Sequence, residues 1–248
     1  MQVSNNQETP LNVAVIGANG GIGEALIWQL ANRTDIGHIY AYSRNYPQAL
    51  SALPKLSYTA LDYENEQSIA DAAKALGDNR LDIVIVATGV LHSDQFAPEK
   101  SIKRLKPESF EAVFKLNTLG PMLVAKHFLP FMNPARKTAF TALSARVGSI
   151  TDNRLGGWYS YRASKAALNM MLKCLAIESQ MRYPQLVIAG LHPGTVNTAL
   201  SEPFQKNVPQ GKLFTADQCA QHLLTVIDTL EQHHSGKVLA WDGQEIKA

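Results

Sequence analysis

A tyrosine and a lysine four residues apart, Tyr161 and Lys165, are the side chains of this chain with the clearest chemical use. Residues at this spacing share one face of a helix, so the Lys165 ammonium can lie near the Tyr161 phenol. A free phenol has a pKa of about 10, too high for efficient proton exchange near neutral pH. A nearby cation favours the phenolate and lowers that pKa, so the pair predicts a tyrosine general acid/base. Taken alone, the same spacing also fits an ordinary exposed helix face.

A glycine-rich turn near the start of the chain favours the chemical interpretation. It follows the apolar run 11–16, which predicts a buried parallel strand, and precedes the helix-forming run 24–31. Glycine lets the backbone approach a pyrophosphate, and a helix N-terminus presents free N–H groups to it. This context predicts a phosphate site formed by Gly17, Asn19, Gly20, Gly21, Ile22 and Gly23. A tight turn without a ligand is the alternative.

Strands and helices alternate along the rest of the chain. Further strands are expected at 38–42, 56–61, 81–87, 138–143, 186–191 and 237–241, and helices at 66–76, 107–131, 161–182 and 216–230. Such alternation predicts an α/β fold of the Rossmann type, a doubly wound parallel sheet of about seven strands with helices on both faces. We expect a flexible N-terminal arm at 1–10 and one domain over 11–248.

Composition excludes several classes of protein. The 248 residues carry a formal charge of only +2, with Lys and Arg scattered, so we expect no nucleic-acid partner. Two cysteines, Cys174 and Cys219, cannot form a disulfide framework and lack metal-ligand spacing, so we expect no metal site. The first ten residues do not read as a secretory signal, and no apolar run approaches the roughly 20 residues of a membrane helix. We therefore expect a cytoplasmic protein without a membrane partner.

The order of these motifs resembles the short form of the short-chain dehydrogenase/reductase family, over essentially the whole chain after the arm. Gly17, Gly21 and Gly23 match its Gly-x-x-x-Gly-x-Gly, although Ile16 stands where threonine is usual. Of its Asn-Ala-Gly, only Gly89 is a full match. Matches to its catalytic positions are Asn117, Ser144, Tyr161 and Lys165, and 193–198 matches its Pro-Gly-x-Val-x-Thr. The runs 152–161 and 236–246 resemble C-factor-like and sniffer-type carbonyl reductases.

The resemblance implies a role for each matched residue. Tyr161 would exchange a proton with a carbonyl or alcohol oxygen, while Lys165 lowers its pKa and binds the nicotinamide ribose. Ser144 would hold the substrate oxygen, and Asn117, shortly before Pro121, would join a water relay to Lys165. Cofactor contacts beyond the glycine turn are implied for Ser43, Arg44, Asp62, Thr88, Gly89, Tyr161, Lys165, Pro193, Gly194, Val196 and Thr198. Asp62 equally fits a turn cap, and His92 and His192 are interpreted as ordinary histidines.

The end of the second strand predicts the cofactor. In dinucleotide-binding sheets an acid at this point bonds the ribose 2′-hydroxyl of NAD, whereas an arginine accommodates the 2′-phosphate of NADP. Here the strand ends in Ser43 and Arg44, with no acid. A serine hydroxyl and a planar guanidinium both suit phosphate. We therefore expect NADP(H) to be preferred over NAD(H).

The expected substrate is a small carbonyl or alcohol compound. Its pocket would be formed by 88–106, by a long insert after Ser144, and by a lid at 195–214. The resemblance implies a homodimer or homotetramer formed through the helices at 107–131 and 161–182, and the surplus apolar surface at 170–172 and 174–176 fits a partner helix. Two alternatives stay open. The glycines also fit the Gly-x-x-Gly-x-x-Gly of an extended-type epimerase or dehydratase, and the fold could serve a cofactor-binding signalling or regulatory protein with little turnover.

Overall fold

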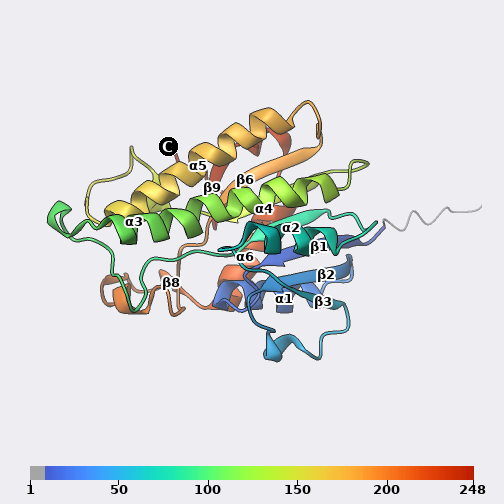
Figure 1. The fold of residues 1–248 in the computed structure, drawn as a ribbon, viewed down its shortest axis with the longest axis horizontal. Coiled ribbons are helices and arrows are strands. Elements are labelled where there is room, and N and C mark those ends of the chain that lie inside the picture. The colour runs from blue at the N-terminus through green and yellow to red at the C-terminus, as the bar shows by residue number, and fades with distance from the viewer. Residues whose placement is uncertain (1–8) are drawn as a thin grey trace, which may run out of the picture.

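The centre of the protein is a seven-stranded sheet in the order β3-β2-β1-β4-β5-β6-β9, seen in a computed structural model that describes residues 9–248 (Figure 1). Every neighbouring pair is parallel. The strands are β1 (Leu11–Ile16), β2 (Ile36–Ser43), β3 (Leu56–Ala60), β4 (Ile83–Val86), β5 (Thr138–Leu143), β6 (Leu186–His192) and β9 (Lys237–Ala240). The predicted fold class is confirmed. A separate two-stranded pair, β7 (Thr195–Val196) and β8 (Leu213–Phe214), was not predicted.

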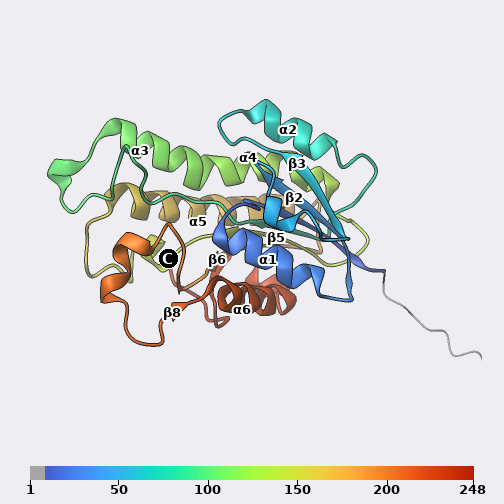
Figure 2. The same ribbon diagram turned by 90° about the horizontal axis from the view of Figure 1, so that it is seen from below.

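Helices cover both faces of the sheet (Figure 2). They are α1 (Gly21–Ala31), α2 (Glu66–Lys74), α3 (Pro107–Phe114), α4 (Gly120–Phe128), α5 (Tyr159–Ser179) and α6 (Ala216–Asp228). Helices α1 and α6 lie on one face, and α2, α4 and α5 pack on the other. Within the described part of the chain, no helix is both long and apolar enough to cross a bilayer. Of the arm expected at 1–10, residues 1–8 lie outside the described residues.

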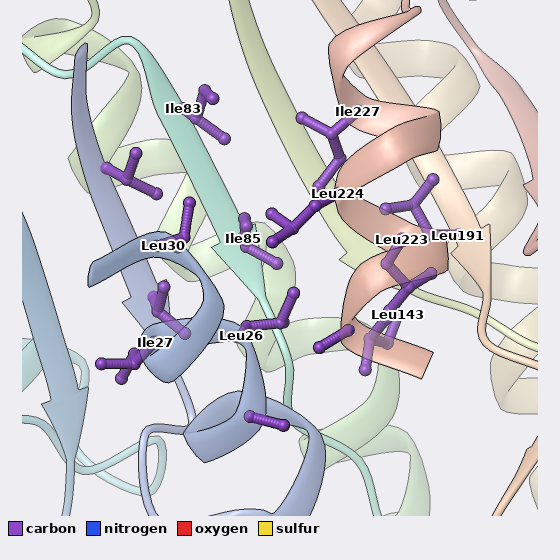
Figure 3. Close-up of a cluster of buried hydrophobic side chains, with 14 of the residues drawn as sticks. Leu26, Ile27, Leu30, Ile83, Ile85, Leu143, Leu191, Leu223, Leu224 and Ile227 are labelled. Atoms are coloured by element: carbon purple, nitrogen blue, oxygen red, sulfur yellow. The ribbon is translucent and has the colours of Figure 1, made fainter. Parts of the chain in front are cut away.

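The two large hydrophobic cores lie on opposite sides of the sheet. Successive strand side chains point to opposite faces, so Val13 and Val15 of β1 belong to one core and Ala14 and Ile16 to the other. Figure 3 shows the first core, in which leucine and isoleucine side chains of α1 and α6 meet those of the strands between them. Burial on both faces explains why these strands read as unbroken apolar runs.

The helix predicted at 107–131 is interrupted in the middle. A π-helical turn at Lys115–Leu119 separates α3 from α4, and a short 3-10 turn at Leu129–Phe131 follows α4. Proline has no N–H, so Pro121 cannot donate to the carbonyl of Asn117 four residues earlier, and its ring crowds that carbonyl. A π-helical turn therefore replaces regular α-helical hydrogen bonding just before Pro121. It places Asn117 at an irregular point of the backbone, where π-helical turns often accompany function.

Candidate active site

A cavity of about 470 Å³ opens at the carboxyl-terminal ends of β1, β4, β5 and β6. This is where ligands bind in open parallel sheets. The predicted site residues that line it are Asn19, Gly20, Gly21, Ile22, Thr88, Gly89, Ser144, Tyr161, Lys165, Pro193, Gly194, Val196 and Thr198. The predicted residues outside its lining are Gly17, Gly23, Ser43, Arg44, Asp62 and Asn117. Segments far apart in sequence thus converge on one cavity.

The glycine turn closes tightly beneath this cavity. Gly17 has a φ of +98°, and its carbonyl accepts the N–H of Gly20 at 2.9 Å. A Cβ on Gly23 would lie only 2.1 Å from the Gly17 oxygen, so this position accepts nothing larger than glycine without a shift. Helix α1 is capped by Gly20, which has no side chain to bond the N–H groups of the first turn. Those N–H groups and the positive end of the helix dipole suit a pyrophosphate.

Lys165 is buried at the centre of the site, with 3% of its surface exposed. Its ammonium donates to the carbonyl of Leu143 at 2.7 Å, and an ammonium has three donors, so two remain for a ligand. Burial lowers the pKa of Lys165 to about 8. The ammonium also lies close to Gly89, where a Cβ would come within 3.4 Å of it.

Tyr161 is half-buried in the cavity wall, and burial raises its pKa to about 12. The predicted lowering by Lys165 is wrong for the polypeptide by itself. The ammonium lies 5.8 Å from the centre of the Tyr161 ring and is bonded to Leu143. Loss of water around the phenol therefore outweighs the cation, and Tyr161 holds its proton at neutral pH.

Ser144 follows β5 and is 3% exposed. Its hydroxyl donates to Oδ1 of Asn169 at 2.6 Å. Asn169 lies four residues beyond Lys165 on α5, so Tyr161, Lys165 and Asn169 form one stripe along the helix. The sequence reasoning missed Asn169. The four-residue spacing of Tyr161 and Lys165, continued by one turn, is the signal that would have found it.

Asn117 is fully buried, and its side chain holds the segment after β4. Its Oδ1 accepts the N–H of Val90 and its Nδ2 donates to the carbonyl of Val90, both at 2.8 Å. Nδ2 also donates to Ser164 at 3.1 Å. The side-chain amide of Asn117 is therefore already used in hydrogen bonds that hold the structure together. The group left for a water relay is the main-chain carbonyl of Asn117, because Pro121 has no N–H to donate to it.

The residues expected to select the cofactor differ in whether their side-chain donors already make hydrogen bonds within the protein. Ser43 is buried and donates to the carbonyl of Asn45 at 2.7 Å, so its proton is already used. Asn19 donates to the same carbonyl at 2.5 Å, which ties the glycine turn to the loop after β2. Arg44 is exposed in that loop. Of these three side chains, that of Arg44 alone makes no hydrogen bond within residues 9–248, and the Asn19 amide keeps one further N–H.

Two other predicted contacts have local explanations. Asp62 accepts the N–H of Glu64 at 3.0 Å, which is the turn cap that the sequence left open. The hydroxyl of Thr88 donates to the phenol of Tyr63 at 2.8 Å, so Thr88 offers its backbone to the cavity while its hydroxyl braces Tyr63.

The three segments expected to form the substrate pocket all reach the cavity. The pocket-lining side chains from these segments are Leu91, Ala145, Arg146, Val147, Trp158, Leu200, Phe204 and Val208, and His192, which the sequence reasoning interpreted as an ordinary histidine, lines the cavity as well. Burial lowers the pKa of His192 to about 4, so its ring is neutral at physiological pH. His92 lies within 3.2 Å of the carbonyls of Ala199 and Leu200, which connects the segment after β4 to the lid. The pocket wall is largely apolar.

Comparisons with known proteins agree with this fold. The model of the family described as short chain dehydrogenase matches residues 11–209. The chain is 30% identical over 233 residues to 1-hydroxy-2-glutathionyl-2-methyl-3-butene dehydrogenase of Rhodococcus sp. (strain AD45), covering 93% of this chain and 96% of the relative. It is 34% identical over 133 residues to C-signal of Myxococcus xanthus, covering 54% and 75%.

Two solved structures have the same fold. The NADPH-bound carbonyl reductase from chicken fatty liver has a TM-score of 0.85 at 26% identity, covering 96% of this chain and 99% of that one. The carbonyl reductase Sniffer of D. melanogaster has a TM-score of 0.80 at 22% identity, covering 97% and 99%. Because the family model spans most of the residues that build the sheet and the cavity, this chain belongs to the short-chain dehydrogenase/reductase family of oxidoreductases.

Proposed function

We propose that this protein interconverts a small carbonyl compound and its alcohol, with NADP(H) as cofactor and Tyr161 as general acid/base. The observation that carries the proposal is the shared cavity. Tyr161, Lys165 and Ser144 line the same 470 Å³ space as the first turn of α1, so a proton donor and a pyrophosphate site face one another. The similarity to an NADPH-bound carbonyl reductase supports it, and the match to short chain dehydrogenases favours a dehydrogenase over an epimerase or dehydratase.

The residues of the cavity fit a nicotinamide dinucleotide. The N–H groups of the first turn of α1, which no side chain caps, suit the pyrophosphate, and the two spare donors of Lys165 suit ribose hydroxyls. When bound, the dinucleotide supplies or accepts the hydride. The polypeptide then has two tasks, which are to bind the cofactor and the substrate and to hold the one proton that is transferred.

At neutral pH, Tyr161 is in the protonated form that donation to a carbonyl oxygen requires. A Tyr161 phenol with a pKa of about 12 keeps its proton and can donate it to a carbonyl oxygen. The Ser144 hydroxyl donates to Oδ1 of Asn169 in this structure and would have to turn from it to donate to the same carbonyl oxygen. Lys165, with a pKa of about 8, is mostly charged at pH 7 and would stabilise the phenolate left after proton transfer.

The preference for NADP(H) rests on Arg44. It is exposed in the loop after β2, where the neighbouring donors Ser43 and Asn19 are already bonded to Asn45. A planar guanidinium binds phosphate through paired hydrogen bonds. With no acid among residues 43–45, the 2′-hydroxyl of NAD would lack its usual partner.

A titration followed by turnover tests the proposal. We expect NADPH to bind more tightly than NADH at one salt concentration, and NADPH to be consumed in the presence of carbonyl compounds. Tyr161→Phe should keep the fold and cofactor binding but lower kcat by about 10²–10⁴-fold. Tyr159→Phe is the matched control, because Tyr159 is exposed and Ala163, not a lysine, stands four residues on. Normal turnover by folded Tyr161→Phe would overturn the assignment of Tyr161.

The relative C-signal gives weight to a second candidate, a cofactor-binding signalling protein with little turnover. The same experiment separates the two. Tight NADPH binding with no consumption over a broad carbonyl panel, in both the unmodified protein and Tyr161→Phe, favours signalling. Consumption that is lost in Tyr161→Phe favours the oxidoreductase.

A further inference from the structure

The chain entering the catalytic helix α5 has an unusual backbone. Gly156, Gly157 and Trp158 have φ values of +63°, +65° and +50° in succession. Within residues 9–248, Trp158 is the one residue other than glycine with a positive φ. A left-handed conformation is unfavourable for a bulky side chain, because its Cβ crowds the following carbonyl. Something in the surrounding structure must therefore hold Trp158 in place.

Glu99, from the segment after β4, makes the contacts that do this. Its main-chain carbonyl accepts the N–H of Trp158 at 2.5 Å. Its carboxylate accepts the N–H of Ser160 at 3.2 Å and also the hydroxyl of Ser160. Glu99, which lies about 60 residues earlier in the chain, is thus hydrogen-bonded both to Trp158 and to Ser160, two residues after it.

The Glu99 side chain is only 4% exposed, which is unusual for a carboxylate. Burying a charge is costly unless it is hydrogen-bonded. Here the carboxylate lies at the N-terminus of α5, where free N–H groups and the positive end of the helix dipole stabilise a negative charge. Arg162 closes the same turn from its other side, donating to the carbonyls of Gly156 and Gly157 at 3.2 and 3.1 Å.

The consequence is the position of the Trp158 ring in the cavity wall. Its centre lies 5.0 Å from that of Phe204 in the lid and 6.2 Å from that of Tyr161. A substrate whose carbonyl oxygen meets Tyr161 therefore presents one of its substituents to Trp158. An aromatic wall of this kind binds a flat apolar group better than a methyl group.

We propose that Glu99 is a positioning residue that holds Trp158 in its left-handed conformation, and that Trp158 is a specificity-determining residue that contacts the substituent of the carbonyl substrate beside Tyr161. The part concerning Trp158 rests on the proposed function. The part concerning Glu99 does not, because it is a statement about backbone geometry. Through Glu99, the segment that supplies one wall of the pocket is bonded to the helix that carries the proton donor.

Crystal structures of two variants test the geometry without any turnover. Glu99→Gln keeps an oxygen for the Ser160 N–H and an amide that can donate to the Ser160 hydroxyl, so the φ of Trp158 should stay positive. Glu99→Ala removes both bonds, so Trp158 should leave the left-handed region and its ring should leave the cavity. Glu108→Ala, which removes an exposed carboxylate from the first turn of α3, is the control and should change neither. An unchanged Trp158 in Glu99→Ala overturns the proposal.

Glu99→Ala could fail to fold, and Ser160→Ala then takes its place. It deletes the hydroxyl that bonds the carboxylate but keeps the Ser160 N–H bond. We expect a displacement of Trp158 in the same direction but smaller. A Ser160→Ala structure in which Trp158 is unmoved and Glu99 keeps its place contradicts the role given to the carboxylate.

Kinetics with two matched diketones test specificity. In 1-phenyl-1,2-propanedione a phenyl group replaces one methyl group of 2,3-butanedione, so the pair isolates the substituent. With NADPH, Trp158→Ala and Glu99→Ala should each raise KM for the phenyl compound by about tenfold, the value of one good aromatic contact. KM for butanedione should change by less than about threefold, since a methyl group makes little of this contact. In Glu99→Gln, KM for the phenyl compound should stay near its value in the unmodified protein.

Equal effects on both diketones, or a Glu99→Gln variant that behaves like Glu99→Ala, would mean that Glu99 supports the fold alone and would refute the proposal. If the unmodified protein reduces no carbonyl compound, the proposed function fails and the role of Trp158 fails with it. The crystal structures still decide the role of Glu99 in that case, so the two failures are distinguishable.

Discussion

Replacing Lys165 by methionine should stabilise the protein while abolishing its activity. Lys165 is almost fully buried, and its ammonium has the single carbonyl of Leu143 as partner among residues 9–248. The fall of its pKa from 10.5 to about 8 means that burying the charge costs about 3 kcal/mol at neutral pH. Methionine fills a similar volume without that charge. The carbonyl of Leu143 then loses its partner, which costs about 1–3 kcal/mol, so we expect a net gain of about 1 kcal/mol.

The pH dependence of this gain identifies its cause. Between pH 8 and 10.5 the unfolded chain holds more protons at Lys165 than the folded chain, so this group's contribution to stability rises with pH. Below pH 8 the cost of the buried charge is complete, and above pH 10.5 it is gone. The advantage of Lys165→Met should therefore be largest at pH 7, about 2–4 °C in Tm for a chain of this size, and should shrink by pH 9.5.

Urea denaturation at pH 7 and pH 9.5 is the assay, with Lys173→Met as control. Lys173 lies on the same helix but is exposed, so its substitution should give no pH-dependent gain. The reasoning is refuted if Lys165→Met is less stable than the unmodified protein at pH 7, or if its advantage is the same at both pH values. NADPH consumption by Lys165→Met, measured alongside, should fall to the level of Tyr161→Phe.

Three further predictions follow from the site and its surroundings. Arg44→Ala should weaken NADPH binding by roughly ten- to a hundredfold while leaving NADH unchanged, as measured by fluorescence titration; equal losses for both would remove Arg44 from cofactor selection. Gly23→Ala should lower the free energy of unfolding by at least about 2 kcal/mol, because its Cβ would lie 2.1 Å from the Gly17 oxygen, whereas Gly20→Ala, at 3.3 Å, should cost clearly less in the same urea titration. Light scattering at micromolar concentration should give a dimer or tetramer that Met170→Glu, on an exposed apolar position of α5, dissociates; a monomeric unmodified protein contradicts this.

What the sequence could predict is governed by short-range geometry. The strands were found because burial on both faces makes unbroken apolar runs, as at Val13 and Ala14 in β1, which face opposite cores. The tyrosine and lysine of the site were found because one helix sets their spacing. Even the π-helical turn had a local signal in Pro121.

Contacts between distant segments could not be predicted in this way. Glu99 reads as an ordinary charged loop residue, and only the folded chain brings it to the start of α5. Ser43 and Thr88 have suitable hydroxyl groups at suitable positions, yet each donates its proton within the protein. A side chain's type says which hydrogen bonds it can make, but the choice of partner depends on neighbours that the sequence does not reveal.

Burial is the property that separates Tyr161 and Lys165 from an ordinary tyrosine and lysine on an exposed helix. It raises the pKa of Tyr161 to about 12 and lowers that of Lys165 to about 8, so the cavity disfavours the charged form of both groups. Titratable groups shifted together in a cleft are a mark of a functional site, because a fold gains no stability from such an arrangement. The protein holds a proton on Tyr161 and keeps a partly deprotonable lysine beside it, which is the arrangement that the proposed reduction of a carbonyl compound needs, and the buried charge of Lys165 lowers the stability of the fold.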